Sequence, residues 1–321
     1  MTIKDRCFLY TALLRRTNLI DHNIYSKSLS TLMKKGYLKK TDSILVVAGG
    51  SYDREIMIKS DFKNVTISNI DFHAGHTDYT PYKWIRIDAE KIEANDNSYD
   101  WAVIHAGLHH LAIPALGVCE MFRVAKKGIL CIEARDSFFM RLAVKFGLTS
   151  DYELEPALLS GGSIGGYRNG AIPNYIYRWK EREFEKTINS FAPTHKHKFI
   201  YLYDIRLPIQ RYAMAKNPLI SIILWILLRL KNIIKFFFPK QGNEFAFVAL
   251  KNIQLQPWLT ASLDFDETFL SKKYDKNKYP GYKENIKIPN EITEQTFKDS
   301  DNNQNMNVYS SLDNFFQKME K

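Results

Sequence analysis

Short apolar runs alternate with helix-like stretches along residues 41–135, and this alternation is the main structural signal of the sequence. The runs that predict strands are "ILVVA" (44–48), "VTISNI" (65–70), "WIRI" (84–87), "WAVIH" (101–105) and "GILCIEA" (128–134). Helices are predicted most clearly at "PALGVCEMFRVAKK" (114–127) and over residues 8–36. Nearly all-apolar strands that alternate with helices are typical of a parallel sheet covered on both faces. Two later runs, residues 197–205 and 243–250, predict two more strands.

Three segments depart from this alternation. Residues 151–178 contain the glycine-rich stretch "LLSGGSIGGYRNGAIPNY", and residues 218–239 form an apolar stretch bounded by prolines. The C-terminal residues are polar and weakly patterned, apart from a short helix expected over 312–319. We therefore predict an N-terminal helical segment (1–40), a main domain (41–255) that carries the glycine-rich loop and the apolar insertion, and a polar tail (256–321).

The turn after the first predicted strand has the residues of a cofactor site. Gly49 and Gly50 follow the strand directly, and Ser51 stands where a glycine-rich nucleotide loop has another glycine. Ligands of open parallel sheets bind beyond the carboxyl ends of the strands. Asp71 ends the second strand at the spacing from which an acid accepts hydrogen bonds from ribose hydroxyls, and Asp88 ends the third, where it can receive a purine amino group. The alternative is that both acids only cap the helices that follow.

Asp53 indicates which cofactor the turn accepts. Dinucleotide enzymes hold a pyrophosphate at the N-terminus of the helix that follows the turn, and Asp53 would place a negative charge there. Such a carboxylate repels phosphates and suits a cationic ligand without phosphate. S-adenosylmethionine, with its sulfonium and ammonium groups, is such a ligand.

Residues 43–135 resemble the class I S-adenosylmethionine-dependent methyltransferases that act on small molecules. "ILVVAGGSYDRE" is similar to their first motif, "ISNIDFHA" to their ribose-binding acid, "IDAEKI" to their adenine-side motif, "SYDWAVIHAGLHHL" to their fourth-strand motif, and "CEMFRVAKKGILCIEA" to their following helix and fifth strand. The resemblance implies a Rossmann-like α/β fold, in which a seven-stranded, mostly parallel sheet ends in an antiparallel hairpin and has helices on both faces. It also implies S-adenosylmethionine as cofactor, bound by Gly49, Gly50, Ser51, Asp53, Asp71, Asp88, Ala89 and His105.

The stretch "HAGLHHL" supplies candidate catalytic residues just past the fourth strand. Transfer of a methyl group to an alcohol requires removal of the hydroxyl proton, and a histidine can accept it near neutral pH. His110 aligns with the family's histidine in this loop, so we predict that it is the base or orients the acceptor, with His109 as the alternate. These histidines could instead only pack or cap the next helix. They could also ligate a metal together with His73 and His76, but no spacing is diagnostic, and we predict no metal site.

A looser resemblance concerns "NYIYRWKEREFEKTINSF" (174–191), which is similar to a segment of methyltransferases associated with surface-polysaccharide or other glycoconjugate synthesis. It implies a saccharide or lipid-linked saccharide as the small-molecule acceptor, with O-methylation favoured. The nearby glycine cluster lacks the G-K-[ST] ending of a phosphate loop, so we interpret it as a mobile lid or acceptor loop. The acceptor contacts expected here are Tyr167, Arg168, Tyr177, Arg178 and Glu183. A surface loop without such a role is the alternative.

The formal net charge of +10 favours an anionic partner. Basic and aromatic residues do not interleave as in RNA-binding proteins, so we do not expect nucleic acid. Residues 219–238 are apolar, but Arg229, Lys231 and Lys235 make a spanning helix too costly. We expect this helix to lie on an anionic membrane with the cations facing lipid phosphates; a helix that covers the sheet or forms a dimer face is the alternative.

The N-terminal residues do not form a signal peptide pattern, and the three cysteines include no CxxC pair. We therefore expect a cytoplasmic protein, peripheral on the inner face of the membrane. Together these patterns predict a methyltransferase of polysaccharide biosynthesis. A methyltransferase-fold partner module without catalysis is the first alternative, kept open by Ser51. A nicotinamide-dependent dehydrogenase is the second, and Asp53 disfavours it.

Overall fold

The computed structural model describes residues 24–72, 75, 77–154, 165–206, 226, 230–252, 254–263, 266, 268–269 and 272. Its strands are β1 (Ser43–Val47), β2 (Asn64–Asn69), β3 (Lys83–Arg86), β4 (Tyr99–His105), β5 (Ala125–Ala134), β6 (Tyr152–Glu153), β7 (Asn174–Tyr175), β8 (Lys198–Asp204) and β9 (Glu244–Leu250). Its helices are α2 (Ile24–Lys34), α3 (Ser51–Lys59), α4 (Pro114–Val124), α5 (Phe138–Lys145) and α7 (Glu181–Phe191), with short 3-10 turns η2 (Leu108–His110), η3 (Tyr167–Asn169) and η4 (Pro239–Gln241).

The chain divides into two compact units. The larger comprises Met1–Pro193 with His197–Ile253 and contains all of these strands and helices. The smaller comprises Thr194–Lys196 with Gln254–Lys321, and His195 and Leu255 form an isolated antiparallel bridge within it.

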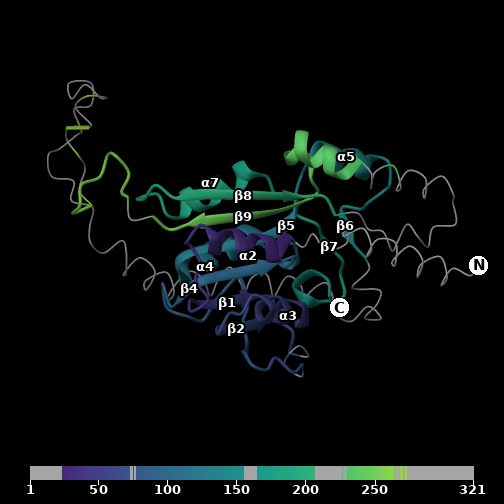
Figure 1. The fold of residues 1–321 in the computed structure, drawn as a ribbon, viewed down its shortest axis with the longest axis horizontal. Coiled ribbons are helices and arrows are strands. Elements are labelled where there is room, and N and C mark those ends of the chain that lie inside the picture. Colours follow the sequence, from purple (N-terminus) through teal and green to yellow (C-terminus); the bar gives the residue numbers. More distant parts are fainter. Residues whose placement is uncertain are drawn as a thin grey trace, which may run out of the picture. The chain divides into compact units, whose positions relative to one another are not determined.

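A seven-stranded sheet with the order β3-β2-β1-β4-β5-β9-β8 forms the centre of the larger unit (Figure 1). Strands β1 to β5 are parallel, whereas β9 runs antiparallel to both β5 and β8. This is the predicted Rossmann-like sheet with its antiparallel end, and the predicted fold class is confirmed. The strand order reverses at β1, which pairs with β2 on one side and β4 on the other. In such sheets the ligand crevice lies beyond the carboxyl ends of the strands at this switch point.

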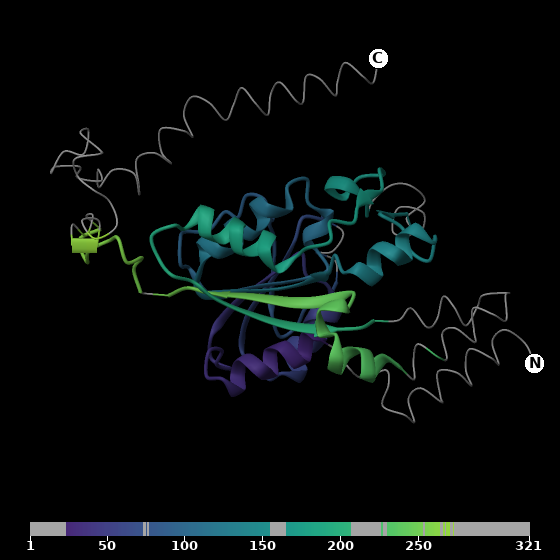
Figure 2. The ribbon, with the colours of Figure 1, turned by 90° about the horizontal axis from the view of Figure 1, so that it is seen from above.

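Each face of the sheet is covered by helices, because successive side chains of a buried strand point to opposite faces. In β1, Ile44 and Val46 belong to one apolar core and Leu45 and Val47 to the other. Helix α2 packs on the first face, where Leu29 is fully buried, and α4 and α7 pack on the second. Figure 2 shows α2, in purple, on one side of the sheet and the teal α7 on the other. A near-continuous apolar strand sequence is the consequence of this double burial.

In the apolar insertion (218–239), the lysine side chains point to another side than predicted. Residues 230–237 are helical. Lys235 Nζ lies 2.6 Å from the buried Asp204 Oδ1, and the Lys231 side chain is itself buried. The expectation that these two lysines face lipid phosphates is therefore wrong, because a buried carboxylate on the sheet side draws them inward; Arg229 lies outside the described residues. The exposed side carries Leu230, Ile233, Phe236, Phe237 and Phe238.

Within the described part of the chain, no helix has both the length and the apolar character needed to cross a membrane. The predicted N-terminal helix is seen as α2, and its residues before Ile24 lie outside the described residues. The same holds for the helix expected over 312–319 and for residues 155–164 of the glycine-rich loop. The proposed domain limits stay a prediction.

Candidate active site

The turn from β1 into α3 contains two glycines, Gly49 and Gly50, whose surroundings differ. A side chain at Gly49 would lie 2.8 Å from Val46 Cγ1 and 2.9 Å from Ile67 Cγ2, so only glycine fits under the turn. A side chain at Gly50 would meet no atom within 4 Å. The turn is therefore tight on its inner side and open on its outer side. Ser51, the first residue of α3, is exposed at this open side, as a cofactor contact requires.

Asp53 lies beneath the turn instead of facing outward. Its side chain is buried, and Oδ2 accepts a hydrogen bond of 2.9 Å from the Gly50 N–H. Burial raises the pKa of Asp53 to about 6, although the Gly50 N–H and the Tyr25 side chain oppose this rise. Asp53 thus holds the turn in shape, and the direct contact with a cationic cofactor stays a prediction.

The two acids expected at the strand ends lie on the same edge of the sheet as the turn. Asp71 follows β2, and its N–H donates to Asn69 Oδ1 at 3.0 Å. Asn69 Nδ2 donates to the Gly49 carbonyl at 3.1 Å, so one side chain links the turn to the acid. Asp88 follows β3 and is exposed, and its Oδ1 accepts from the Glu90 N–H. Next to it Ala89 is buried, a position that suits packing more than polar contact.

His105 closes the cofactor side at the end of β4. Its ring lies between Tyr25 and Tyr52, with centroid distances of 5.2 and 5.3 Å. Burial lowers the pKa of His105 to about 4, so the ring is neutral near pH 7. The backbone at the neighbouring strand ends is strained, because Ala48 (φ 50°) and Ala106 (φ 51°) adopt the left-handed conformation. The His105 ring is thus a flat, uncharged surface beside the turn.

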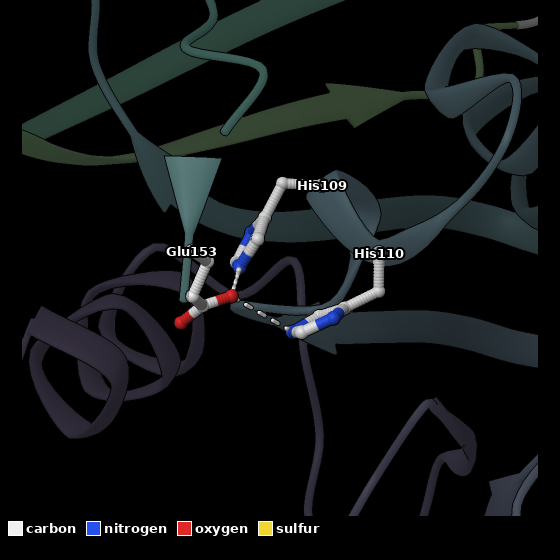
Figure 3. A group of neighbouring side chains, drawn as sticks. All are labelled: His109, His110 and Glu153. Carbon is white, nitrogen blue, oxygen red and sulfur yellow. Dashed lines mark ion pairs between the residues drawn. The ribbon is translucent and has the colours of Figure 1, made fainter. Parts of the chain in front are cut away.

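A cluster of two histidines and two glutamates lies next to this surface, beyond β4 and β5. His109 Nδ1 is 2.7 Å from Glu133 Oε2, and His109 Nε2 is 3.2 Å from Glu153 Oε2. His110 Nε2 is 3.5 Å from the same Glu153 oxygen. Figure 3 shows both imidazoles turned toward this oxygen. The structure thus brings together the two predicted histidines and adds two carboxylates to them.

Three elements hold the cluster. The η2 turn places the histidines, and its Leu108 N–H donates to Glu133 Oε1 at 2.6 Å. Glu133 comes from β5 and has a fully buried side chain. Glu153 comes from β6, whose partner Asn174 on β7 donates from Nδ2 to the His109 carbonyl at 2.9 Å. Both histidines are thereby fixed by backbone and side-chain contacts.

The members of the cluster shift one another's pKa values in different directions. Burial by itself lowers the pKa of His109, but the charges and hydrogen bonds of Glu133 and Glu153 outweigh this and raise it to about 10. Burial and then the charge of His109 lower the pKa of His110. The hydrogen bond from His109 lowers the pKa of Glu153. At pH 7 His109 is therefore a cation and His110 is neutral.

Among the described residues, His109, His110 and Glu153 are the one group of His, Cys, Asp or Glu side chains that brings three ligand-type atoms within 4.8 Å of one another. His73 and His76, considered as further ligands from the sequence, lie outside the described residues. Glu153 and Asn174 were not among the site residues predicted from the sequence. Glu153 lies 43 residues after His110 in the sequence. No local sequence pattern predicts that these two residues meet.

The residues predicted to contact the acceptor differ in their surroundings. Arg178 forms an ion pair with Asp151 at 2.6 Å and is almost completely buried. Glu183 caps α7 by accepting from the Lys180 N–H. Both side chains thus stabilise the fold. Tyr167, Arg168 and Tyr177 are partly or fully exposed, and their contact with an acceptor stays a prediction.

Residues 54–132 match the family model described as "Methyltransferase domain". The match begins within α3 and ends within β5, so it includes Asp71, Asp88 and the histidine turn but not the turn after β1. Residues 54–132 of this chain are a methyltransferase domain. S-adenosylmethionine is accordingly the cofactor of this methyltransferase.

Solved structures of methyltransferases are similar to this one. A SAM-dependent methyltransferase from Archaeoglobus fulgidus is 11% identical, with 76% of this chain and 99% of that chain covered and a TM-score of 0.43. One from Methanosarcina mazei is 14% identical (69% and 98% covered, TM-score 0.41). Magnesium protoporphyrin IX methyltransferase from Synechocystis with bound SAH is 10% identical (71% and 82% covered, TM-score 0.42). No match to a curated protein was found. Nothing about the acceptor follows from these likenesses.

The residues around the β1 turn fit S-adenosylmethionine. The turn is open above Gly50, where a bound ligand can approach the backbone. Asp71 and Asp88 stand at the two next strand ends, where ribose hydroxyls and an adenine amino group need acceptors. The methyltransferase would therefore hold the cofactor with Gly50, Ser51, Asp71 and Asp88.

Proposed function

We propose that this methyltransferase transfers the methyl group to a hydroxyl oxygen of a saccharide-type acceptor held beside His110. The observation that carries the proposal is the histidine–glutamate cluster beyond the carboxyl ends of β4 and β5. Both ring nitrogens of His109 are engaged by carboxylates, whereas the His110 side chain is 32% exposed and accessible to a ligand. His110 is therefore the base, and His109 is the residue that positions Glu153.

Two tyrosines beside the cluster support a saccharide. Tyr152 and Tyr175 face each other across the β6–β7 pair, with ring centroids 5.4 Å apart. Both rings are more than half exposed. Exposed tyrosine rings offer an apolar face for the C–H side of a sugar and a hydroxyl for its oxygens. Tyr152 precedes Glu153 in the chain, and successive side chains of a strand point to opposite faces, so the two rings lie on the other face of the β6–β7 pair from Glu153. A saccharide on these rings would reach the cluster around the edge of this short pair.

S-adenosylmethionine, when bound, supplies an electrophilic methyl group on a sulfonium, whose loss leaves a neutral thioether. The contact with Glu153 favours the His110 tautomer that is protonated at Nε2, which leaves the Nδ1 lone pair to accept the hydroxyl proton. The tyrosines and the cluster also align the acceptor with the methyl group. Such alignment lowers the activation free energy by up to about 7–11 kcal/mol in favourable systems. The protein thus aligns the acceptor and receives one proton.

The proposal is tested by methyl transfer from radiolabelled S-adenosylmethionine to a panel of saccharides. We expect His110→Asn to lower kcat by about 10²–10⁴-fold, the range for a general base, with the cofactor Kd unchanged. Tyr152→Ala and Tyr175→Ala should raise KM for the saccharide and leave the cofactor Kd unchanged. His195→Asn, in the smaller unit, is the matched control and should behave as the native protein.

Full turnover by His110→Asn would show that another residue is the base. A titration with S-adenosylmethionine and with NAD tests the alternatives that the sequence left open. Binding of NAD alone would indicate a dehydrogenase, and binding of neither would indicate a partner module.

We also propose a peripheral membrane contact through the exposed side of residues 230–238. Its large apolar side chains include three consecutive phenylalanines, and aromatic residues favour the lipid headgroup boundary. The lysines of this segment face Asp204 and not solvent. This arrangement favours an apolar contact with the membrane that depends little on the charge of the lipids.

A further inference from the structure

The three side chains of Figure 3 have the separations of metal ligands. Glu153 Oε2 lies 3.2 Å from His109 Nε2 and 3.5 Å from His110 Nε2. Two atoms that each bind Zn²⁺ at about 2.0–2.2 Å in a tetrahedral arrangement lie about 3.3–3.5 Å apart. The three ligand atoms all lie within 4.8 Å of one another, so an ion can enter between them after movement of the side chains.

The hydrogen-bond partners of His109 are also those of a metal-ligating histidine. Metal-ligating histidines usually donate their other ring N–H to a carboxylate or a carbonyl, which fixes the tautomer and the ring orientation. Here Glu133 takes that place, with Oε2 2.7 Å from His109 Nδ1. The position of Glu133 is itself fixed by the Leu108 N–H. A metal ion that binds here must displace the Nε2 proton of His109, and the Nε2 lone pair then points toward Glu153 and His110.

We propose that His109 Nε2, His110 Nε2 and a Glu153 carboxylate oxygen form a binding site for a divalent metal ion, for which Zn²⁺ is the best match. Two imidazoles and one carboxylate are the protein ligands of many catalytic zinc sites, which keep a fourth position open. The His110 and Glu153 side chains are each about one third exposed, although the Glu153 Oε2 atom is itself buried, so a ligand would reach the fourth position along the exposed parts of these two side chains. No metal site was predicted from the sequence, because the spacing of the histidines is not diagnostic.

The ion changes the role of His110. With Nε2 holding a metal ion, the ring proton of His110 would lie on Nδ1, and His110 would no longer be the base. The ion would instead lower the pKa of an acceptor hydroxyl at the open position, and the released proton would pass to solvent. This role rests on the proposed function, whereas the binding of the ion requires only the three ligands and Glu133.

The test is a titration of the full-length, EDTA-treated protein with Zn²⁺ by calorimetry, and with Co²⁺ by visible absorption. We expect one ion per chain and the strong absorption of four-coordinate Co²⁺. Glu153→Gln and His110→Asn should each weaken Zn²⁺ binding at least about 100-fold, and Glu133→Gln about 10–100-fold. His195→Asn should bind Zn²⁺ as the native protein does. Circular dichroism and the S-adenosylmethionine Kd verify that each variant is folded.

Zn²⁺ binding that survives Glu153→Gln and His110→Asn, or no Zn²⁺ binding by the folded native protein, would overturn the metal site. Methyl transfer by the EDTA-treated protein tests the proposed function separately. If that protein methylates a saccharide and Zn²⁺ does not bind, only the metal site is wrong. If Zn²⁺ binds and no saccharide is methylated with or without it, only the proposed function is wrong.

Discussion

At the scale of single residues, burial decides what a carboxylate does. Asp53 and Asp71 both follow strands of the parallel sheet, and both are acids expected at a cofactor site. The structure buries Asp53 beneath the turn, where it accepts from Gly50, and leaves Asp71 partly exposed beyond β2. The sequence shows the position of both acids but not the side to which each carboxylate points.

The buried state of Asp53 predicts a pH-dependent stability. Its folded-state pKa of about 6 lies above its ordinary value of 3.8, so ionisation is disfavoured in the folded protein. The folded state then loses stability from this group as pH rises from about 4 to about 6, by at most ~3 kcal/mol at 1.36 kcal/mol per pKa unit. Asp53→Asn should therefore raise the free energy of unfolding at pH 8 and have little effect near pH 4.

Urea unfolding of Asp53→Asn at several pH values measures this effect. The exposed Asp61, whose pKa is lowered by Lys63 and Lys40, offers the control Asp61→Asn, which should give no gain at pH 8. An equal effect of Asp53→Asn at both ends of the pH range would contradict the assignment.

At the scale of elements, the helix of residues 230–237 shows how packing reorients an amphipathic segment. Its lysines pair with or approach Asp204 at the end of β8, and its phenylalanines remain in solvent. A long cationic side chain can bury its stem and still reach a carboxylate. The apolar face is therefore the outer one, which reverses the expectation for a helix held to a membrane by its charges.

Phe236→Asp combined with Phe237→Asp is expected to reduce vesicle binding about tenfold or more, because a charge in the headgroup boundary opposes apolar insertion. Both side chains are more than 60% exposed, so the melting temperature should not change. Co-sedimentation with zwitterionic and with anionic vesicles measures the effect. Binding to anionic vesicles alone, abolished by salt, would instead indicate an electrostatic contact made elsewhere.

At the scale of the whole molecule, the site has two halves that come from different parts of the chain. The cofactor half is built from the ends of β1 to β4, and the acceptor half from η2, β5 and the β6–β7 pair. The histidine turn joins the halves, because it directly follows β4. Changes in one half should therefore leave binding to the other half intact.

Asp71→Ala should weaken S-adenosylmethionine binding about 10–100-fold, the loss expected for hydrogen bonds to a charged group. Glu153→Gln, in the acceptor half, should leave the cofactor Kd unchanged. Calorimetric titration of the two variants measures both values. Unchanged affinity in Asp71→Ala would mean that this acid does not hold the ribose.

The sequence by itself determined the strands of the main sheet, the parallel arrangement of the first five and the edge at which the cofactor is predicted to bind. Apolar periodicity is a local property, and a residue at the end of a buried parallel strand always reaches the same edge of the sheet. Only the tertiary structure decided that Glu153 lies against His109 and His110, that Asp53 is buried and that Lys231 and Lys235 turn inward. The physical reason is that side-chain burial and the pairing of distant segments, such as β6 with β7, depend on packing across the whole larger unit and leave no local pattern.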